Sequence, residues 1–355
     1  MASRRSRALD WLDERTGVRG LVRKQLLEYL IPATTNRWYS LGFVLLVFVA
    51  IQLVSGFLLL FYYVPDASLA FDSIERIMHE IPYGWLIRLI HVHGANAMVI
   101  VLLLHMLVVV ATNAYKRPRE LHWLTGCLLL FTTLGLCFTG YLLPWSQLSF
   151  WATTVGMRIV QSVPYVGPTI MEYFQGGTVV GPTTLGRAFA FHASLLPLLL
   201  LVLIAVHIYL VRHTGISSLP GASPDAVARK RRFFPGFLLE DAAVALGFLA
   251  AFSGVLFFLP HLYLPPEAFE KADPFTTPLH VKPEWYFLAQ YQVLRLVPSK
   301  TLGILLQLVA FAALLLLPFL DRSECRDPRK RPIFLVGFVI VVLGSVALTL
   351  LGALA

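Results

Sequence analysis

Four histidines stand inside long apolar runs of this chain, at spacings that suit the coordination of two haems. His91 and His105 are 14 residues apart, and His192 and His207 are 15 residues apart. In an α-helix, 14 residues return to within about 40° of the same face after a rise of about 21 Å, and 15 residues to within about 60°. Two such helices present one imidazole pair at each of two depths, the axial ligand set of a haem. A single intramembrane histidine is as readily a structural residue, hydrogen-bonded within the helix bundle, as a haem ligand. Four histidines at two matched depths favour the interpretation as haem ligands.

Four glycines repeat the same period. Gly42 and Gly56 are 14 residues apart in one apolar run, and so are Gly126 and Gly140 in another. Glycine lets a flat macrocycle approach the backbone closely, so flanking helices of this kind suit two stacked haems. Small-residue helix packing is the alternative, and the match to the histidine period favours haem contact over it. His93 points about 200° away from His91, so these two histidines do not form a chelate.

The composition shows that lipid must solvate the chain. Of 355 residues 57% are hydrophobic and only 14% charged, and the mean hydropathy is +0.72, whereas an average soluble chain is about 25% charged. A cytosolic enzyme, a disordered scaffold and a disulfide-stapled secreted module are therefore excluded. Cys127, Cys137 and Cys325 form no CxxC pair, so we expect neither a structural disulfide nor a thiolate metal site.

Seven stretches are long enough to cross a bilayer, which needs roughly 20 apolar residues in a helix. The sequence predicts an all-α membrane protein whose first four spans form a haem-binding bundle, followed by three C-terminal helices. One span separates the two histidine helices, so they run parallel, and we expect His91 to face His192 and His105 to face His207. Residues 1–32 carry scattered charges on an amphipathic pattern, which predicts a surface helix instead of a signal peptide. The spans are approximately 39–62, 83–111, 121–143, 187–211, 241–263, 301–320 and 332–354.

Basic residues predict the orientation. In an alternating seven-span arrangement, 21 of the 29 Lys and Arg residues fall on the side of the N-terminus, so that side is cytoplasmic by the positive-inside rule. The net charge of +9 then reports orientation and not nucleic-acid binding. The long connections 144–186 and 264–300 lie on the opposite, positive side, and their Pro, Gly and aromatic content predicts structured loops.

Four segments resemble cytochrome b of the cytochrome bc1 and b6f complexes. They are GWLIRLIHVHGA (84–95), KRPRELHWLTG (116–126), GYLLPWSQLSFW (140–151) and ADPFTTPLHVKPEWYF (272–287), of which PEWY is the most diagnostic. The resemblance spans nearly the whole chain and implies a dihaem bundle over 33–215 and a subunit IV-like C-terminal domain over 216–355, after the segment 1–32.

The resemblance implies the cytochrome b subunit of a proton-translocating quinol oxidoreductase, with a c-type cytochrome or a plastocyanin-type protein as the acceptor. Quinol would be oxidised at the positive side, with one electron passing to a Rieske iron–sulfur protein and the other crossing the membrane through two non-covalent b-type haems to a quinone. The expected partners are that Rieske protein, a c-type cytochrome, lipid and a second copy in a dimeric complex. The expected location is a bacterial inner membrane, with several spans and the N-terminus in the cytoplasm.

Several features lean toward the b6 branch. Three features resemble cytochrome b6 joined to subunit IV: the 15-residue spacing of His192 and His207, the segment VRHTGIS (211–217) and the segment KRPREL. The segment FFPGFLLED (233–241) instead resembles the bc1 branch. Chloroplast-type b6 proteins carry a cysteine that tethers a third haem, and this chain has Ser40 there. Because serine cannot form that thioether, we expect no covalently attached third haem.

For quinol oxidation the resemblance implies Glu284 of PEWY as the proton acceptor. Tyr286, Tyr141 and Tyr291 would line the pocket. Apolar surroundings can raise a carboxyl pKa until the group exchanges protons near neutral pH. The alternative is a loop carboxylate paired with Arg295 or Lys282. His280 and Lys282, which flank the motif, are solvated loop charges or part of a proton exit.

At the cytoplasmic side the expected quinone-reduction residues are Arg212, Asp241 and Ser40. Arg212 is equally a topological anchor at a helix end. Arg88, one turn before His91, is placed to pair with a haem propionate. In b6 proteins an arginine follows the second histidine of this helix by three residues. In this chain the residue three positions after His105 is Val108, so the propionate partners of the haem on the cytoplasmic side stay open. We expect the basic run 229–232 to contact anionic lipid.

Two other functions fit part of the pattern. A dihaem membrane anchor of a dehydrogenase or hydrogenase also uses paired histidines, but it needs neither PEWY nor the long loop 264–300. A secondary transporter predicts broken helices and paired intramembrane charges in two repeated halves, and the interiors of these spans hold almost no acidic residues.

Overall fold

The computed structural model describes residues 4–262, 264–278 and 281–354, and the chain is mostly helical. His280, singled out above as a flank of PEWY, lies outside the described residues. In the described part, six helices are long and apolar enough to cross a membrane. They are Arg37–Leu60, Gly84–Ala111, Glu120–Leu142, Pro182–Thr214, Phe233–Phe258 and Pro332–Leu354.

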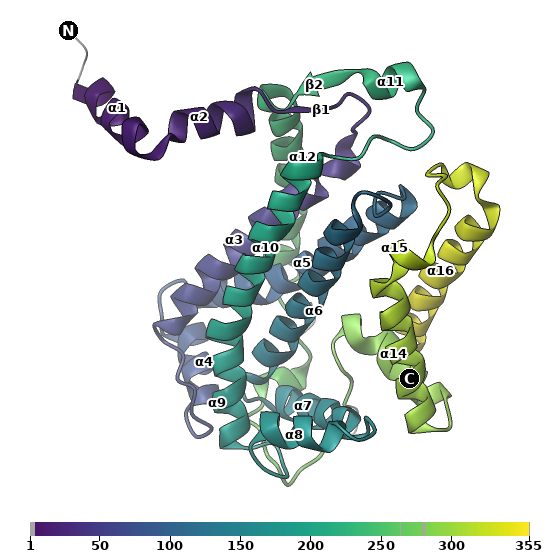
Figure 1. Ribbon diagram of the computed structural model, residues 1–355. Helices are drawn as coiled ribbons and strands as arrows, with labels where there is room; N and C mark the ends of the chain where they lie inside the picture. Colours follow the sequence, from purple (N-terminus) through teal and green to yellow (C-terminus); the bar gives the residue numbers. More distant parts are fainter. Residues whose placement is uncertain (1–3, 263, 279–280, 355) are drawn as a thin grey trace.

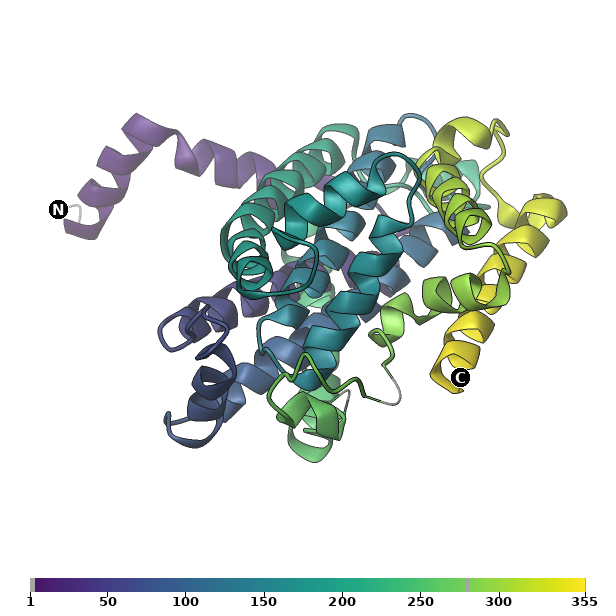
Figure 2. The same ribbon diagram turned by 90° about the horizontal axis from the view of Figure 1, so that it is seen from below.

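The elements are arranged as two groups of helices joined by loops (Figure 1). Figure 2 shows the C-terminal helices at one edge of the bundle and the N-terminal helices extending from another. The helices are α1 (Arg4–Thr16), α2 (Val18–Val22), α3 (Leu41–Leu60), α4 (Ala70–His79), α5 (Gly84–Ala111), α6 (Glu120–Leu142), α7 (Gln147–Gln161), α8 (Gly167–Gln175), α9 (Pro182–Ala190), α10 (Leu196–Thr214), α11 (Pro224–Ala228), α12 (Leu238–Phe258), α13 (Leu288–Leu296), α14 (Lys300–Leu315), α15 (Leu317–Leu320) and α16 (Pro332–Leu354). The strands are β1 (Leu30–Pro32) and β2 (Lys230–Arg232).

The seventh expected span is divided. An apolar helix of 16 residues, α14, ends at Leu315, and the short α15 resumes at Leu317 with Pro318 in its first turn. Proline lacks the N–H that a continuous helix needs at this point. The count of seven spans is therefore not confirmed, because this stretch is shorter than the six others.

The bundle core forms where α3 packs against α5 and α12. Leu41, Val44 and Phe48 of α3 meet Met98 of α5 and Phe252 of α12, and each of these side chains is at most 9% exposed. The outer faces stay apolar as well: on α16 the side chains of Val341 and Ile340 are 66% and 64% exposed. A helix that is apolar all round suits a lipid environment.

The N-terminal segment is tied to the loop before α12. β1 pairs with β2 antiparallel, with Ile31 opposite Arg231. Arg231 also pairs with Glu240 at 2.6 Å and lies over the ring of Phe237 at 4.9 Å. Arg231 thus has protein partners while its side chain stays 29% exposed, and the contact of the run 229–232 with anionic lipid stays a prediction.

A buried ion cluster joins the loop after α5 to the loop before α16. The Asp321 carboxylate accepts hydrogen bonds from Lys116 (2.8 Å), Arg331 (2.6 Å) and the hydroxyl of Tyr115, and Arg331 also donates to Asn113 at 2.6 Å. The side chains of Lys116, Asp321 and Arg331 are only 6%, 9% and 11% exposed. We call these five residues the Asp321 cluster.

We predict that Asp321→Asn destabilises the protein by about 3–5 kcal/mol, because removing one partner of a buried ion pair leaves uncompensated buried charge. The midpoint of denaturation in detergent should fall accordingly. Glu80→Gln, at an exposed ion pair with Arg76 on α4, should leave the midpoint unchanged. Equal midpoints for Asp321→Asn and the wild type would show that the cluster contributes no net stability.

The pH dependence of this cluster has a definite sign. Burial alone would raise the pKa of Asp321, but hydrogen bonds from Lys116, Tyr115 and Arg331 outweigh it and hold that pKa below its usual value. A carboxyl whose pKa is depressed on folding adds stability above its unfolded pKa and loses it as the pH falls through the folded pKa. The Asp321 cluster is therefore intact at neutral pH and weakens only in strongly acidic solution.

Candidate functional site

The four histidines lie in two pairs: His91 and His105 on α5 face His192, in the turn just before α10, and His207 on α10. The rings of His91 and His192 have their centroids 6.0 Å apart at an interplanar angle of 84°. His105 lies within electrostatic range of His207. We name the two ends of the bundle the His91 end and the His105 end after these pairs.

The ring nitrogens show which atom each histidine leaves free. His192 donates from Nδ1 to the carbonyl oxygen of Leu136 at 2.9 Å, so its Nε2 carries the lone pair. The hydroxyl of Ser55 donates to a backbone carbonyl and accepts from His91 Nδ1 at 2.9 Å. Thr125 does the same for His207 Nδ1 at 2.8 Å. Such outer partners fix the tautomer of a metal-binding imidazole and leave Nε2 available to the metal.

The four glycines each face one histidine ring. A Cβ at Gly56 would lie 3.1 Å from His91, one at Gly42 3.7 Å from His105, and one at Gly126 3.8 Å from His207. A Cβ at Gly140 would overlap the His192 ring, with 2.8 Å to Nδ1. The glycines of α3 and α6 thus surround the two imidazole pairs two by two, and a bis-histidine haem fits this donor set.

The backbone at His192 departs from a regular α-helix. Residues Phe191–Leu195 form a π-helical turn between α9 and α10, and Pro197 follows at the start of α10. Proline cannot donate the regular backbone hydrogen bond, and a wider turn absorbs one extra residue. The 15-residue step from His192 to His207 therefore acts like the 14-residue step in α5.

Sequence reasoning missed the hydroxyls beside the histidines, although a signal exists. Three of the four glycines directly follow a hydroxyl residue, in Ser55-Gly56, Thr125-Gly126 and Thr139-Gly140. Thr139 lies 3.5 Å from His192 Nδ1. Leu41 stands at the corresponding position before Gly42. A Ser/Thr-Gly dipeptide at this period thus marks both the glycine contact and the hydrogen-bond partner of the ring.

We predict that Ser55→Ala weakens haem retention at the His91 pair by about 10- to 100-fold, because the variant frees the ring that Ser55 orients. The haem content after dilution and the midpoint potential of that haem measure the effect. Ser345→Ala is the matched control, because Ser345 makes the same bond to a carbonyl one turn earlier on the exposed face of α16. Equal haem retention in both variants would contradict the role of Ser55.

Two further histidines lie near the pairs. His93 is 2% exposed and its Nε2 bonds to the carbonyl oxygen of Pro260 at 2.9 Å, on the opposite side of α5 from His91. His122, which the sequence did not single out, has its ring centroid 6.3 Å from that of His207, and its Nε2 bonds to Thr214 at 2.8 Å. Both rings therefore have protein partners of their own.

Arg88 is buried beside the His91 pair. It is 4% exposed, and its Nη1 has no hydrogen-bond partner in the described part of the chain. Glu75 lies within electrostatic range of this guanidinium, and Nη1 would donate a hydrogen bond to a carboxylate-bearing ligand at this end of the bundle. The haem carboxylates are of this chemistry.

A cavity of about 270 Å³ lies between α6, α7, α13 and α14, and all four expected quinol-site residues line it: Glu284, Tyr286, Tyr141 and Tyr291. Burial raises the pKa of Glu284 to about 7, against the opposing effect of a hydrogen bond from Tyr141. Burial also raises the pKa of Tyr286 well above its usual value, so this phenol stays neutral. Cys137, which the sequence did not single out, lines the cavity within hydrogen-bonding reach of Tyr286.

The cations that could have paired with Glu284 have other partners. Lys282 donates to the carbonyl oxygen of Ala353 at 2.6 Å. The guanidinium of Arg295 lies 5.9 Å from the centre of the Tyr291 ring. Glu284 is therefore directed into the cavity beside Tyr141, with a proton affinity suited to exchange near neutral pH.

The loop that carries PEWY is tied to the start of α7. Gln147 accepts from the backbone N–H of Asp273 at 2.9 Å and donates to the carbonyl of Thr276 at 3.1 Å. Trp151 donates to the carbonyl of Asp273 at 3.3 Å. The motifs 140–151 and 272–287, more than 120 residues apart in sequence, thus build one wall together.

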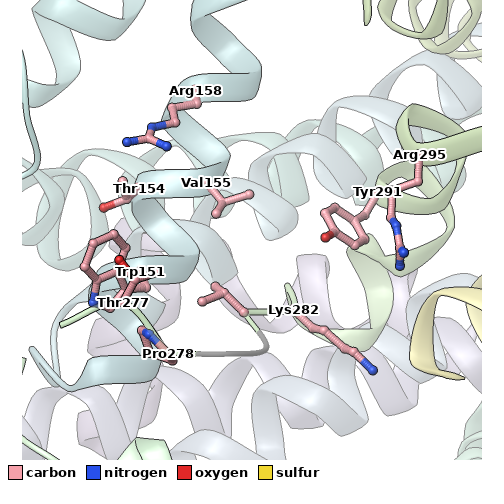
Figure 3. A pocket seen from close by; sticks show the side chains of 10 residues that line it. Trp151, Thr154, Val155, Arg158, Thr277, Pro278, Lys282, Tyr291 and Arg295 are labelled. Carbon is pink, nitrogen blue, oxygen red and sulfur yellow. The ribbon is translucent and has the colours of Figure 1, made fainter. Parts of the chain in front are cut away.

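A second cavity of about 510 Å³ lies on the outer side of this wall (Figure 3). Trp151, Arg158 and Thr277 lie on one side of this cavity, and Tyr291 and Arg295 lie on the other. Tyr291 lines both cavities, so the outer one adjoins the quinol-site candidate.

At the His105 end, Ser40 lies within hydrogen-bonding reach of Asp241, and Arg212 within electrostatic range of it. Asp241 is 4% exposed, and its Oδ1 lacks a partner in the described residues. The Arg212 guanidinium lies over Tyr29 at 4.3 Å and Phe233 at 4.8 Å. The structure thus brings the three expected quinone-reduction residues together.

Fold and site define a class: a multi-span helical membrane protein with two levels of paired histidines and a carboxylate-lined cavity beside one pair. Residues 26–215 match the family model "Cytochrome b/b6/petB", and residues 271–355 match "Cytochrome b(C-terminal)/b6/petD". The chain belongs to the cytochrome b family, and these matches with the relatives below support a bc1-type cytochrome b.

Known relatives agree over nearly their whole length. The chain is 37% identical to cytochrome b of Allochromatium vinosum, with 99% of this chain and 89% of that protein covered, and 35% identical to cytochrome b of Rhodospirillum rubrum, with 98% and 86% covered. A solved structure, "Hyperthermophilic respiratory Complex III", is 43% identical with a TM-score of 0.89, covering 97% of this chain and 91% of that one. The chain is therefore an electron-transfer subunit of a respiratory oxidoreductase. Its family implies that it binds b-type haem. The alternative function, the membrane anchor of a dehydrogenase or hydrogenase, is not favoured.

Proposed function

We propose that this chain is the cytochrome b subunit of a proton-translocating quinol:cytochrome c oxidoreductase with electron bifurcation. One observation carries the proposal. Gly140 faces the ring of His192, and the next residue, Tyr141, lines the cavity that holds Glu284. A quinol in that cavity would therefore contact the residue that directly follows a haem-facing glycine. It would also lie beside Glu284, which is able to accept its proton.

Two non-covalent b-type haems fit the imidazole pairs His91 with His192 and His105 with His207. When bound, they supply one-electron transfer between the two ends of the bundle. The residues of this chain supply the rest: Ser55 and Thr125 hold the rings, the four glycines make space for the macrocycles, and Arg88 neutralises carboxylate charge. Because Ser40 stands at the tethering position, we propose no covalently attached third haem.

Glu284 accepts the proton of a quinol hydroxyl, because a buried carboxylate with a pKa near 7 is matched to this transfer at neutral pH. Tyr141 orients the carboxylate, and Tyr286 and Tyr291 bound the pocket. Of the two electrons of quinol, one passes to a Rieske iron–sulfur protein and one passes into the bundle. At the His105 end Arg212 and Ser40 bind a quinone, and Asp241 passes on the protons that the quinone takes up together with the electrons from the bundle.

The outer cavity of about 510 Å³ suits the docking of the Rieske protein, because it adjoins the quinol site and is lined by the cations Arg158 and Arg295. We further propose a c-type cytochrome subunit, a dimeric complex, and a bacterial inner membrane with the N-terminus in the cytoplasm. The seven-span arrangement counts the stretch 300–320 as a span. The proposed domains are the surface segment 1–32, the dihaem bundle 33–215 and the C-terminal domain 216–355.

The test is purification of the complex with pyridine haemochrome analysis, identification of the copurifying subunits, and assay of quinol-dependent reduction of a c-type cytochrome. We expect two b haems per chain, an iron–sulfur subunit, and a reaction that fails when that subunit is removed. Quinol-dependent haem reduction that needs no iron–sulfur partner would overturn the proposal and support a simple electron relay.

A further inference from the structure

Glu284 stands between two polar anchors of its own loop. On one side the indole N–H of Trp285 donates to the side-chain oxygen of Asn96 on α5 at 2.7 Å. On the other side the ammonium of Lys282 donates to the carbonyl oxygen of Ala353 at 2.6 Å, at the end of α16. The backbone that carries Glu284 is thus tied both to the histidine bundle and to the last helix.

The end of α16 is a firm support for this anchor. A Cβ at Gly352 would lie 2.9 Å from the carbonyl oxygen of Leu288, so α16 packs against the start of α13 with no space for a side chain. The carbonyl oxygen to which Lys282 bonds belongs to Ala353, the residue directly after Gly352. Lys282 therefore links the PEWY loop to α16 beside the close contact of α16 with α13.

We propose that Lys282 is a positioning residue for the Glu284 carboxylate, acting through its bond to the carboxyl end of α16. This inference rests on the proposed role of Glu284. Lys282 lines the outer cavity and does not line the quinol cavity, so it acts on Glu284 through the loop and not by touching quinol (Figure 3). The groups that face Glu284 itself are Tyr141, Cys137 and Tyr286.

The test compares Lys282→Met with the wild type in the purified complex. Because a shift of about 1 Å in a reacting group can cost on the order of 100-fold in rate, we expect kcat for quinol oxidation to fall about 10- to 100-fold with KM and haem content unchanged. Lys282→Arg, which keeps the donor, should restore most of the rate. In a Glu284→Gln background, Lys282→Met should add no further loss.

The pH profile separates positioning from simple loss of charge. A loosened loop admits water to Glu284, which lowers its pKa, so the rising limb of the rate should move to lower pH. If Lys282 acted only as a nearby positive charge, its loss would raise the pKa of Glu284 and move the rising limb to higher pH. That outcome would overturn the proposal. Lys271→Met is the matched control, because Lys271 is a cation of the same loop that pairs with Asp72 on α4. An equal loss there would also overturn it.

The failure of this inference differs from failure of the proposed function. Wild-type kinetics for Lys282→Met, with a strong loss for Glu284→Gln, would remove the positioning role alone. Wild-type kinetics for Glu284→Gln would remove the proposed function of the loop, whatever Lys282→Met shows.

Discussion

A His192→Leu variant is expected to lose the haem at the His91 end while it keeps the other one. Leucine has no ligand atom, and bis-imidazole ligation needs both rings of the pair, so about half of the b-haem absorbance should disappear. Quinol-dependent reduction of a c-type cytochrome should fall to background, because the path between the ends of the bundle is interrupted. A reduced-minus-oxidised spectrum of the isolated complex measures the first effect, and steady-state turnover the second.

His93→Leu is the matched control for this experiment. His93 lies two residues from His91 and is buried, but it bonds to the carbonyl of Pro260 and not to a histidine pair. Its loss should cost about 1–3 kcal/mol of stability through an unsatisfied carbonyl and leave both haems in place. Retention of both absorption components in His192→Leu would show that the histidine pair is not a ligand set.

The arrangement in space of the four glycines and of His91 and His105 could be predicted, because it depends only on helical period. A step of 14 residues fixes the face and the depth whatever the rest of the fold does, and the structure places Gly42, Gly56, Gly126 and Gly140 against the rings accordingly. Six of the seven expected spans could be predicted for a similar reason, since bilayer thickness sets their length. What these residues bind stays a prediction of the sequence and the family.

Other features depend on contacts that no local pattern encodes. The π-helical turn at Phe191–Leu195 makes a 15-residue step equivalent to 14, but a proline after a histidine does not by itself specify a wider turn. The anchoring of the PEWY loop needs Gln147, Asn96 and Ala353, which are distant in sequence. The division of the stretch 300–320 follows from Pro318, whose effect on an apolar run of marginal length was not anticipated.

A Glu284→Gln variant is expected to slow quinol oxidation by about 10²- to 10⁴-fold, the range in which a positioned general base contributes. Glutamine keeps the shape of the side chain but cannot accept a proton at neutral pH, so KM should change little while kcat falls. Glu172→Gln, at an exposed residue of α8, the helix beside α7 (Figure 1), is the control and should keep the wild-type rate.

The pH dependence gives this prediction a sign. The carboxylate is the accepting form, and burial raises the pKa of Glu284 to about 7, so kcat/KM should rise about tenfold per pH unit below pH 7 and level off above it. Tyr141→Phe removes a hydrogen bond that lowers this pKa, so the limb should move to higher pH. Glu284→Gln should abolish the limb. A limb that persists in Glu284→Gln would assign the proton transfer to another group, because no titratable side chain would then remain at position 284.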